Sequence, residues 1–139
     1  MEYKILSKYI KDISFEIPNT RAFVMLEKEI SNYSLNFDIK SNPVKDNIIE
    51  VNTVLKAVPN QEVKHKIFAE ITCTAVVSID SNFEDKKELE KIILIKIPTE
   101  VYSTLYNTFV YLFTQSGIKN IQIDKKVDFE KLYNNRKKS

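Results

Sequence analysis

Apolar and polar residues alternate in four segments of the chain, with the two-residue period of a β-strand. In each segment the apolar side chains fall mainly on odd-numbered positions and the polar ones on even-numbered positions. This pattern predicts four strands that each bury one face and expose the other. The predicted strands are residues 9–17, 33–40, 49–57 and 63–79.

The links between these segments predict how the strands pair. Pro43–Asp46 and Pro59–Glu62 are short and carry turn residues, so the second, third and fourth strands are expected to form successive antiparallel hairpins. The link from Asn19 to Asn32 is longer and matches neither a strand nor an obvious helix. It suits a crossover that carries the first strand past its neighbour in the sheet.

Helical signals replace the alternation after the fourth strand. Residues 80–87 are polar and predict a loop. A long helix is expected over Thr99–Ser116, with Gly117 in the position of a left-handed cap. A shorter helix is expected from Phe129 to about residue 135, after an extended connection at residues 121–123. The 139 residues are 43% hydrophobic, which suits one α+β domain over residues 1–139.

The predicted long helix is apolar on almost all sides. Between residues 101 and 113 it carries no charge, and two adjacent stripes of large side chains run along it. One sheet can cover only one side of a helix, so we expect a second copy of the chain to cover the other side. The alternative is that the tyrosine hydroxyls face water and the helix lies flat on its own sheet. The residues expected at the interface between copies are Tyr102, Tyr106, Phe109, Val110 and Phe113.

Composition argues against catalysis, cofactors, nucleic acid and membrane insertion. The 21 basic and 19 acidic residues are intermixed, so no strong attraction to nucleic acid or anionic lipid is expected. One glycine is too few for a phosphate-binding loop, and the single His65 and Cys73 predict neither a metal site nor an internal disulfide. Apolar runs such as Ile92–Ile95 are far shorter than the roughly 20 residues of a membrane span. Together with an N-terminus unlike a signal peptide, this predicts a soluble cytoplasmic protein that is not an enzyme.

Two groups of side chains are candidates for binding partners. On the outward side of the first and fourth predicted strands, acids accompany an outward aromatic residue, which suits a docking patch. The alternative is that these acids are simply solvated. The residues of this candidate patch are Asp12, Glu16, Phe68 and Glu70.

A second candidate is an apolar groove between the crossover and the short helix. The crossover holds consecutive apolar residues, among them a flexible methionine, and the short helix has apolar residues at helical spacing. If the two regions face each other they would form a groove; alternatively they would only close the core. The candidate groove residues are Phe23, Val24, Met25, Leu26, Phe129, Leu132 and Tyr133.

Several motifs resemble one family in their order along the chain. The run Tyr9–Asn19, with its Asp-Ile-Ser-Phe-Glu-x-Pro-Asn string, resembles the first strand of the SecB protein-export chaperones. Phe68–Ile71 resembles the fourth strand of that family, and Pro98 followed by a tyrosine- and phenylalanine-rich segment resembles its main helix. Val127–Tyr133 resembles the segment that closes the family's fold.

The resemblance implies a fold, an assembly and partners. It implies an α+β subunit with a four-stranded antiparallel sheet, a long crossover after strand one, and one long and one short C-terminal helix packed on the sheet. It implies a homotetramer, a dimer of dimers with the long helices at the interface. It also implies a groove under the crossover that binds unfolded precursor proteins without ATP, and delivery of these clients to the SecA motor. By position, Asp12, Glu16 and Glu70 match acids that dock SecA in the family.

Two other functions remain compatible with these residues. SecB-like proteins also serve as chaperones dedicated to antitoxins, and the sequence does not separate the two kinds of client. The chain could also be an oligomeric adaptor that assembles through its apolar helix and has no client groove. An RNA-binding role is disfavoured, because basic residues are not gathered on one strand face beside exposed aromatic residues.

Overall fold

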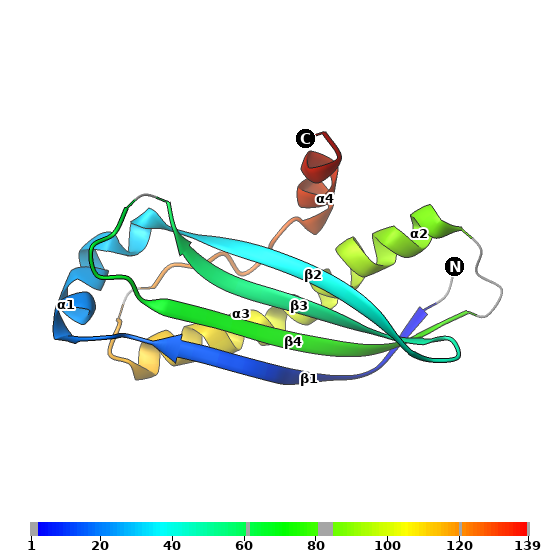
Figure 1. Cartoon of the computed structure of the whole chain (residues 1–139), viewed down its shortest axis with the longest axis horizontal. Coiled ribbons are helices and arrows are strands. Elements are labelled where there is room, and N and C mark those ends of the chain that lie inside the picture. The colour runs from blue at the N-terminus through cyan, green and yellow to red at the C-terminus, as the bar shows by residue number, and fades with distance from the viewer. Residues whose placement is uncertain (1–2, 61, 81–84, 120, 139) are drawn as a thin grey trace.

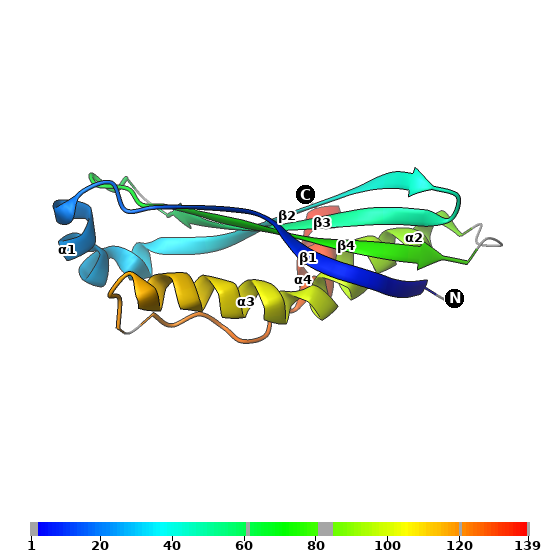
Figure 2. The ribbon, with the colours of Figure 1, turned by 90° about the horizontal axis from the view of Figure 1, so that it is seen from below.

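A computed structural model describes residues 3–60, 62–80, 85–119 and 121–138. It contains a four-stranded antiparallel sheet with one long helix packed on one face, and this arrangement confirms the predicted fold class (Figures 1 and 2). The strand order across the sheet is β1-β4-β3-β2. The strands are β1 (Tyr3–Glu16), β2 (Tyr33–Lys45), β3 (Ile48–Pro59) and β4 (Phe68–Ile79).

The predicted connections between strands are confirmed, with one correction. β2, β3 and β4 are successive antiparallel neighbours, and β1 and β2 lie at opposite edges of the sheet, as a crossover requires. The crossover is helical, however: it contains α1 (Thr20–Glu29) and a 3₁₀ turn (Ile30–Asn32). The side-chain oxygen of Asn19 accepts a hydrogen bond from the Ala22 amide at 2.9 Å and caps α1. The expectation of a non-helical link was therefore wrong.

The alternation of buried and exposed residues is regular in β2, β3 and β4 but not in β1. Two bulges, between Ile5 and Ser7 and between Ile10 and Asp12, shift the side-chain period of β1. Tyr9, predicted to face the core, consequently pairs with Thr74 on the opposite face of the sheet and is exposed. After the second bulge the pattern returns to the predicted phase.

The ends of the strands also differ from the prediction. β1 begins at Tyr3 rather than Tyr9, and β4 begins at Phe68 rather than at residue 63. Val63 and Ile67 are nevertheless buried, so the apolar pattern before β4 marks core contacts rather than a strand. His65, expected within that strand, lies in the irregular segment.

The long helix lies where it was predicted, as α3 (Ile97–Gln115). It continues α2 (Lys86–Lys91), which was not predicted, through one π-helical turn (Ile92–Lys96). Pro98 has no amide hydrogen for the helix ladder, and the preceding amide of Ile97 bonds the Ile92 carbonyl instead. Part of the expected loop at residues 80–87 is therefore helical, and its residues 81–84 lie outside the described part of the chain.

Gly117 ends α3 in the left-handed conformation, as the sequence predicted. Its φ angle is 95°, and the Ile118 amide donates to the Phe113 carbonyl at 3.0 Å. The ring of Phe23 on α1 would lie 3.3 Å from a Cβ atom at this glycine. The turn therefore fixes the place where α1 packs against the end of α3.

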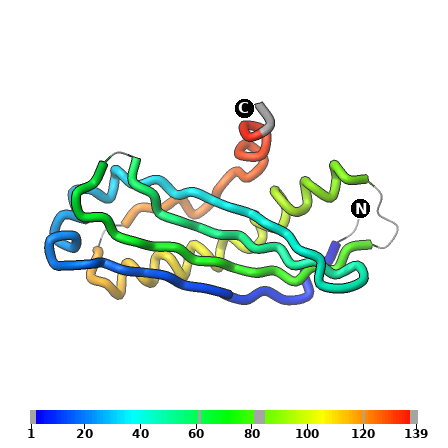
Figure 3. The backbone as a smooth tube through the Cα atoms, in the orientation of Figure 1, coloured from blue at the N-terminus to red at the C-terminus, as the bar shows by residue number. Residues whose placement is uncertain are grey.

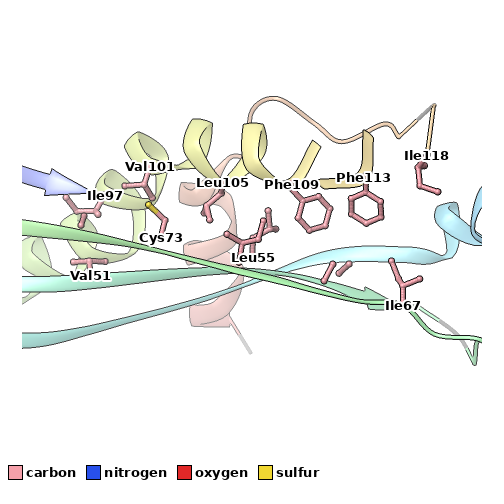
Figure 4. Close-up of a cluster of buried hydrophobic side chains, with 14 of the residues drawn as sticks. Val51, Leu55, Ile67, Cys73, Ile97, Val101, Leu105, Phe109, Phe113 and Ile118 are labelled. Atoms are coloured by element: carbon pink, nitrogen blue, oxygen red, sulfur yellow. The ribbon is translucent and has the colours of Figure 1, made fainter. Parts of the chain in front are cut away.

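The core lies between α3 and the inner face of the sheet, the face that carries the odd-numbered residues of β3 and β4. Val101, Leu105, Phe109 and Phe113 project from α3 toward the strands (Figure 4). The Phe15 ring of β1 meets the Phe113 ring edge-on at a centroid distance of 5.1 Å. These contacts bury one side of α3 within the subunit.

The last part of the chain returns along α3 and then forms a helix. The connection after Gly117, called the linker below (residues 118–119 and 121–127), runs beside α3 on the side away from the sheet (Figures 2 and 3). The C-terminal helix, α4 (Phe129–Lys138), begins where predicted and ends three residues later than predicted. The Asp128 carboxylate accepts a hydrogen bond from the Lys131 amide at 3.0 Å and caps it.

Candidate binding groove and outer sheet face

A groove of about 780 Å³ lies between the inner face of β2, α3, the linker and α4. Its walls are mainly apolar and aromatic, with a few charged groups, a composition typical of a site for apolar ligands. The residues that line it are Ile30, Tyr33, Ser34, Leu35, Asn36, Phe37, Asp38, Ile39, Ala57, Leu94, Tyr102, Phe109, Phe113, Ile121, Gln122, Ile123, Asp124, Val127, Phe129, Leu132, Tyr133 and Arg136.

Three aromatic rings from three different elements meet in this groove. The Phe37 ring on β2 lies 5.0 Å from Phe129 and 5.8 Å from Tyr102, centroid to centroid, and all three pairs meet edge-on. The Tyr102 hydroxyl donates to the Asp124 carbonyl at 2.5 Å, which ties the linker to α3. Burial, followed by the charges of Asp124 and Tyr106, raises the pKa of Tyr102 to about 12, so it remains a donor at neutral pH. The aromatic floor is therefore held together by contacts within the chain itself.

The free edge of the sheet also belongs to this groove. Seven consecutive residues of β2, from Tyr33 to Ile39, contribute to its lining, so both faces of the strand reach it. β2 is an edge strand, and such a strand presents backbone amide and carbonyl groups to which another chain can bond. The groove can thus offer apolar pockets for side chains and backbone partners for an extended segment.

Of the seven residues that we predicted to face one another across a groove, three lie at the groove in the structure and four do not. Phe129, Leu132 and Tyr133 line the groove. The residues predicted from the crossover are on α1, which lies at one end of the sheet, whereas α4 lies near the middle of its length (Figure 1). The crossover residues absent from the lining are Phe23, Val24, Met25 and Leu26.

The reason is that α1 has other contacts. Leu26 is buried in the core, Phe23 packs on the turn at Gly117, and Val24 and Met25 are exposed. Among the groove residues that sequence reasoning missed are Leu35 and Phe37, which were assigned to the core, and the linker residues Ile121 and Ile123. The sequence did contain a hint of the two linker residues, because two isoleucines in a segment expected to be extended had been given no packing partner.

The predicted interface between copies also needs correction. Tyr102, Phe109 and Phe113 are buried within the subunit, so they do not form a surface for a second copy. We expected that nothing else in the chain could cover the far side of α3, but the linker runs along it (Figure 2). Of the predicted residues, Tyr106 and Val110 remain partly exposed, and next to them Tyr111, which was not predicted, is 61% exposed.

The acids predicted to face outward do share the outer face of the sheet. In the register of β1 and β4, Glu16 lies opposite Phe68, and Glu70 lies opposite Ser14. Asp12 lies further along β1 on the same face, where its carboxylate accepts a hydrogen bond from the Ser14 hydroxyl at 3.3 Å. We call Asp12, Glu16 and Glu70 the acidic patch. Within the described residues no lysine or arginine lies within ion-pair distance of these three carboxylates.

Phe68 is an outward aromatic residue within this patch. It is 43% exposed, and the Lys56 ammonium on β3 lies 5.6 Å from the centre of its ring. Lys56 pairs with Glu70 in the β3–β4 register. The outer face therefore brings the four predicted docking residues together and adds a lysine that was not predicted.

Within the described residues, no group of three or more histidine, cysteine, aspartate or glutamate side chains is arranged to hold a metal ion. Cys73 is fully buried in the core, and burial raises the pKa of its thiol, which disfavours the nucleophilic thiolate. None of the helices in the described ranges combines the length and the apolar character that a membrane crossing demands.

Comparison with known proteins agrees with the fold and with the motifs. The family described as preprotein translocase subunit SecB matches residues 1–139. The chain is 45% identical over 134 residues to a putative protein-export protein SecB of Pelagibacter ubique, covering 96% of each, and 29% identical to the protein-export protein SecB of Rhodospirillum rubrum, covering 95% of this chain and 80% of the relative. A similar solved structure is a SecB-like chaperone of Mycobacterium tuberculosis in complex with a ChAD peptide from the HigA1 antitoxin. Its TM-score is 0.68 at 11% identity, over 90% of this chain and 88% of that one, which shows likeness of fold.

Proposed function

The chain belongs to the SecB family of protein-export chaperones, and we propose that it holds non-native precursor proteins in the groove beside β2 and delivers them to the SecA motor. The observation that carries this proposal is the preformed aromatic floor of Phe37, Tyr102 and Phe129. An unfolded client exposes apolar side chains, and covering them contributes about 25 cal/mol per Å². Binding of this kind is reversible and needs no nucleotide, so the holding step is ATP-independent.

The groove suits clients that share no sequence. The edge of β2 offers backbone partners to any extended segment, while the apolar walls select for hydrophobic side chains. Several grooves on one oligomer would bind one long client at several places and gain avidity. We place this activity in the cytoplasm, where precursors await export.

A pair of aspartate substitutions tests the groove. Leu132 is 45% exposed at the groove, so Leu132→Asp puts a charge at the client site with little loss of stability. Val24 on α1 is 59% exposed and does not line the groove, so Val24→Asp is the matched control. Light scattering of an aggregating, denatured model protein should rise with Leu132→Asp and stay suppressed with Val24→Asp. Equal suppression by both variants would contradict the proposed groove, and no suppression by the wild type would favour the adaptor alternative.

We propose that the long helices join copies of the chain into a tetramer, a dimer of dimers. Tyr106, Val110 and Tyr111 are the exposed or partly exposed apolar residues of α3 that support this contact. Mass measurement in native buffer should give a tetramer for the wild type and smaller species for Tyr111→Glu. A wild-type monomer at micromolar concentration would reject the assembly.

The acidic patch on the outer face is the proposed SecA-docking site. Within the described residues its three carboxylates make no ion pair, and they flank an exposed aromatic ring. Such a face suits a cationic partner segment, with an affinity that falls as salt screens the charges.

A second candidate client is an antitoxin. The similar M. tuberculosis chaperone is described in complex with an antitoxin peptide, and a groove with an open strand edge suits such a peptide equally well. Competition between a precursor-derived and an antitoxin-derived peptide for the groove distinguishes the two. Preference for the antitoxin peptide by a factor of ten or more would favour the dedicated chaperone.

A further inference from the structure

The contact between Lys56 and Phe68 lies at the centre of the proposed docking site. Phe68 begins β4 and points away from the core, and the Lys56 ammonium lies 5.6 Å from the centre of its ring. An ammonium at this distance is attracted by the electrons of the ring face. The aliphatic stem of the lysine also covers part of an aromatic surface that water would otherwise contact.

The charges around this ring are unbalanced. Glu16 lies opposite Phe68 on β1, Glu70 lies two residues along β4 on the same face, and Asp12 lies further along β1. The patch thus holds three carboxylates against the single ammonium of Lys56. Lys56 pairs with Glu70 in the register but lies over the ring, outside ion-pair distance of that carboxylate. The potential at the ring therefore favours a cation, and one from the chain itself already occupies the position.

We propose that Lys56 is an internal competitor: it occupies the cation position on the Phe68 ring that a lysine or arginine of the docking partner takes on binding. This inference rests on the proposed docking function and adds a residue that sets its affinity. When the partner binds, Lys56 leaves the ring and the partner's cation replaces it between Glu16 and Glu70. Lys56 thus lowers the affinity of the face for segments with few cationic residues, so that the face selects partners with several lysines or arginines.

A matched pair of lysine substitutions tests this role. Lys56→Gln removes the competitor, whereas Lys40→Gln removes the same charge from the same face of the sheet at β2, where Lys40 pairs with Asp38 at 3.7 Å. The probe is a synthetic oligoarginine peptide, titrated by calorimetry at low salt. We expect Lys56→Gln to bind about 3- to 10-fold more tightly than the wild type, and Lys40→Gln to change affinity by less than about 2-fold.

Two further variants separate the effect of the cation on the Phe68 ring from the effect of the net charge of the face. Lys56→Arg keeps a cation over the ring and should bind the peptide as the wild type does. In the double variant Lys56→Gln/Phe68→Ala the gain should disappear, because the ring that accepts the cation is gone. Equal gains from Lys56→Gln and Lys40→Gln, or a gain that persists without Phe68, would overturn the inference. Thermal unfolding of each variant checks that these exposed substitutions leave the fold intact.

Purified SecA in the same titrations distinguishes this inference from the docking function itself. If SecA and the peptide both bind Lys56→Gln more tightly, both proposals stand. If the peptide follows the prediction but SecA binds none of the proteins, the docking function fails while the competitor role stands. If SecA binds the wild type and all variants with equal affinity, and the peptide also does not distinguish them, the docking function stands and the competitor role of Lys56 is wrong.

Discussion

The two faces of the sheet are built from the same strands, but the inner face forms the core and the outer face faces away from it. On the inner face, Val51, Leu55 and Cys73 are fully buried beneath α3. On the outer face the alternate residues of the same strands bond to one another across strands, as the Thr74 hydroxyl does to Asn52 at 2.6 Å. Because successive side chains of β3 and β4 point to opposite faces, a substitution on one face can change stability without altering the surface that the other face offers to a partner. The inner face specifies the fold, and the outer face is available for a partner.

The groove arises where this division is incomplete. α3 covers the inner faces of β3 and β4 fully, but the inward residues of β2 are only half-buried. Leu35 and Phe37 therefore have the sequence pattern of core residues and the exposure of binding residues. A client would complete, at β2, the burial that α3 provides elsewhere.

The sharpest test of the two faces compares one phenylalanine from each. Phe113 is fully buried and contacts the rings of Phe15 and Phe109, so Phe113→Ala should lower the free energy of unfolding by about 3–5 kcal/mol. Phe68 is half-exposed on the outer face, and Phe68→Ala should cost less than about 1 kcal/mol. Urea denaturation measures both. Similar losses would contradict the division of roles between the faces.

This division could be predicted from the sequence wherever the alternation is unbroken. The alternation correctly predicted which residues of β2, β3 and β4 face the core. It also predicted the outward position of Asp12, Glu16 and Glu70. The failure at Tyr9 has a physical cause, since a bulge moves one residue out of register and no local residue type announces it.

The groove was harder to predict because it depends on contacts distant in sequence. The helical character of α1 was not recognised, and its apolar residues were assigned to a groove that lies elsewhere. The linker is held along α3 by the hydrogen bonds of the Tyr102 hydroxyl to the Asp124 carbonyl and of the Ile118 amide to the Phe113 carbonyl, and by the packing of Phe129 on Phe37. No periodic pattern encodes these contacts.

Reversing the acidic patch should separate docking from holding. The triple variant Asp12→Lys/Glu16→Lys/Glu70→Lys changes only outer-face positions, and each exposed charge contributes about 0.5–1 kcal/mol to a cationic partner. We expect SecA affinity to fall by about 10- to 150-fold, while suppression of client aggregation is unchanged. Unchanged SecA affinity in surface-plasmon measurements would refute the docking assignment.

A pair of threonines sharpens the comparison at smaller magnitude. The Thr53 hydroxyl is buried on the inner face and finds no hydrogen-bond partner among the described residues. Thr53→Val removes this unsatisfied group at nearly constant volume and should stabilise the fold by about 1–2 kcal/mol. Thr72 lies on the outer face and is half-buried, so Thr72→Val should change stability by less than about 0.5 kcal/mol. Thermal unfolding that ranks the two variants in the opposite order would contradict the assignment of the faces.

The smallest expected effect concerns two tyrosines on the inner side of the sheet. Burial raises the pKa of Tyr3 from 10.0 to about 12, assisted by its hydrogen bond to Glu100 at 2.6 Å and by the charge of that carboxylate. Burial is also the main reason that the pKa of Tyr102 is about 12. Because the folded state keeps both hydroxyls protonated more strongly than the unfolded state, their contribution to stability is complete below pH 10 and is lost as the pH rises from 10 toward 12.

Alkaline denaturation of single variants resolves this contribution. Tyr3→Phe should lose the hydrogen bond to Glu100 at neutral pH and show a shallower decline of stability between pH 10 and 12 than the wild type. Glu100→Gln keeps an acceptor for the Tyr3 hydroxyl but removes the charge that helps to raise its pKa, so its decline should lie between the two. If the wild type and Glu100→Gln share one slope that is steeper than that of Tyr3→Phe, burial alone raises the pKa of Tyr3. If all three proteins lose stability with the same slope, folding does not raise the pKa of Tyr3, and the prediction is wrong.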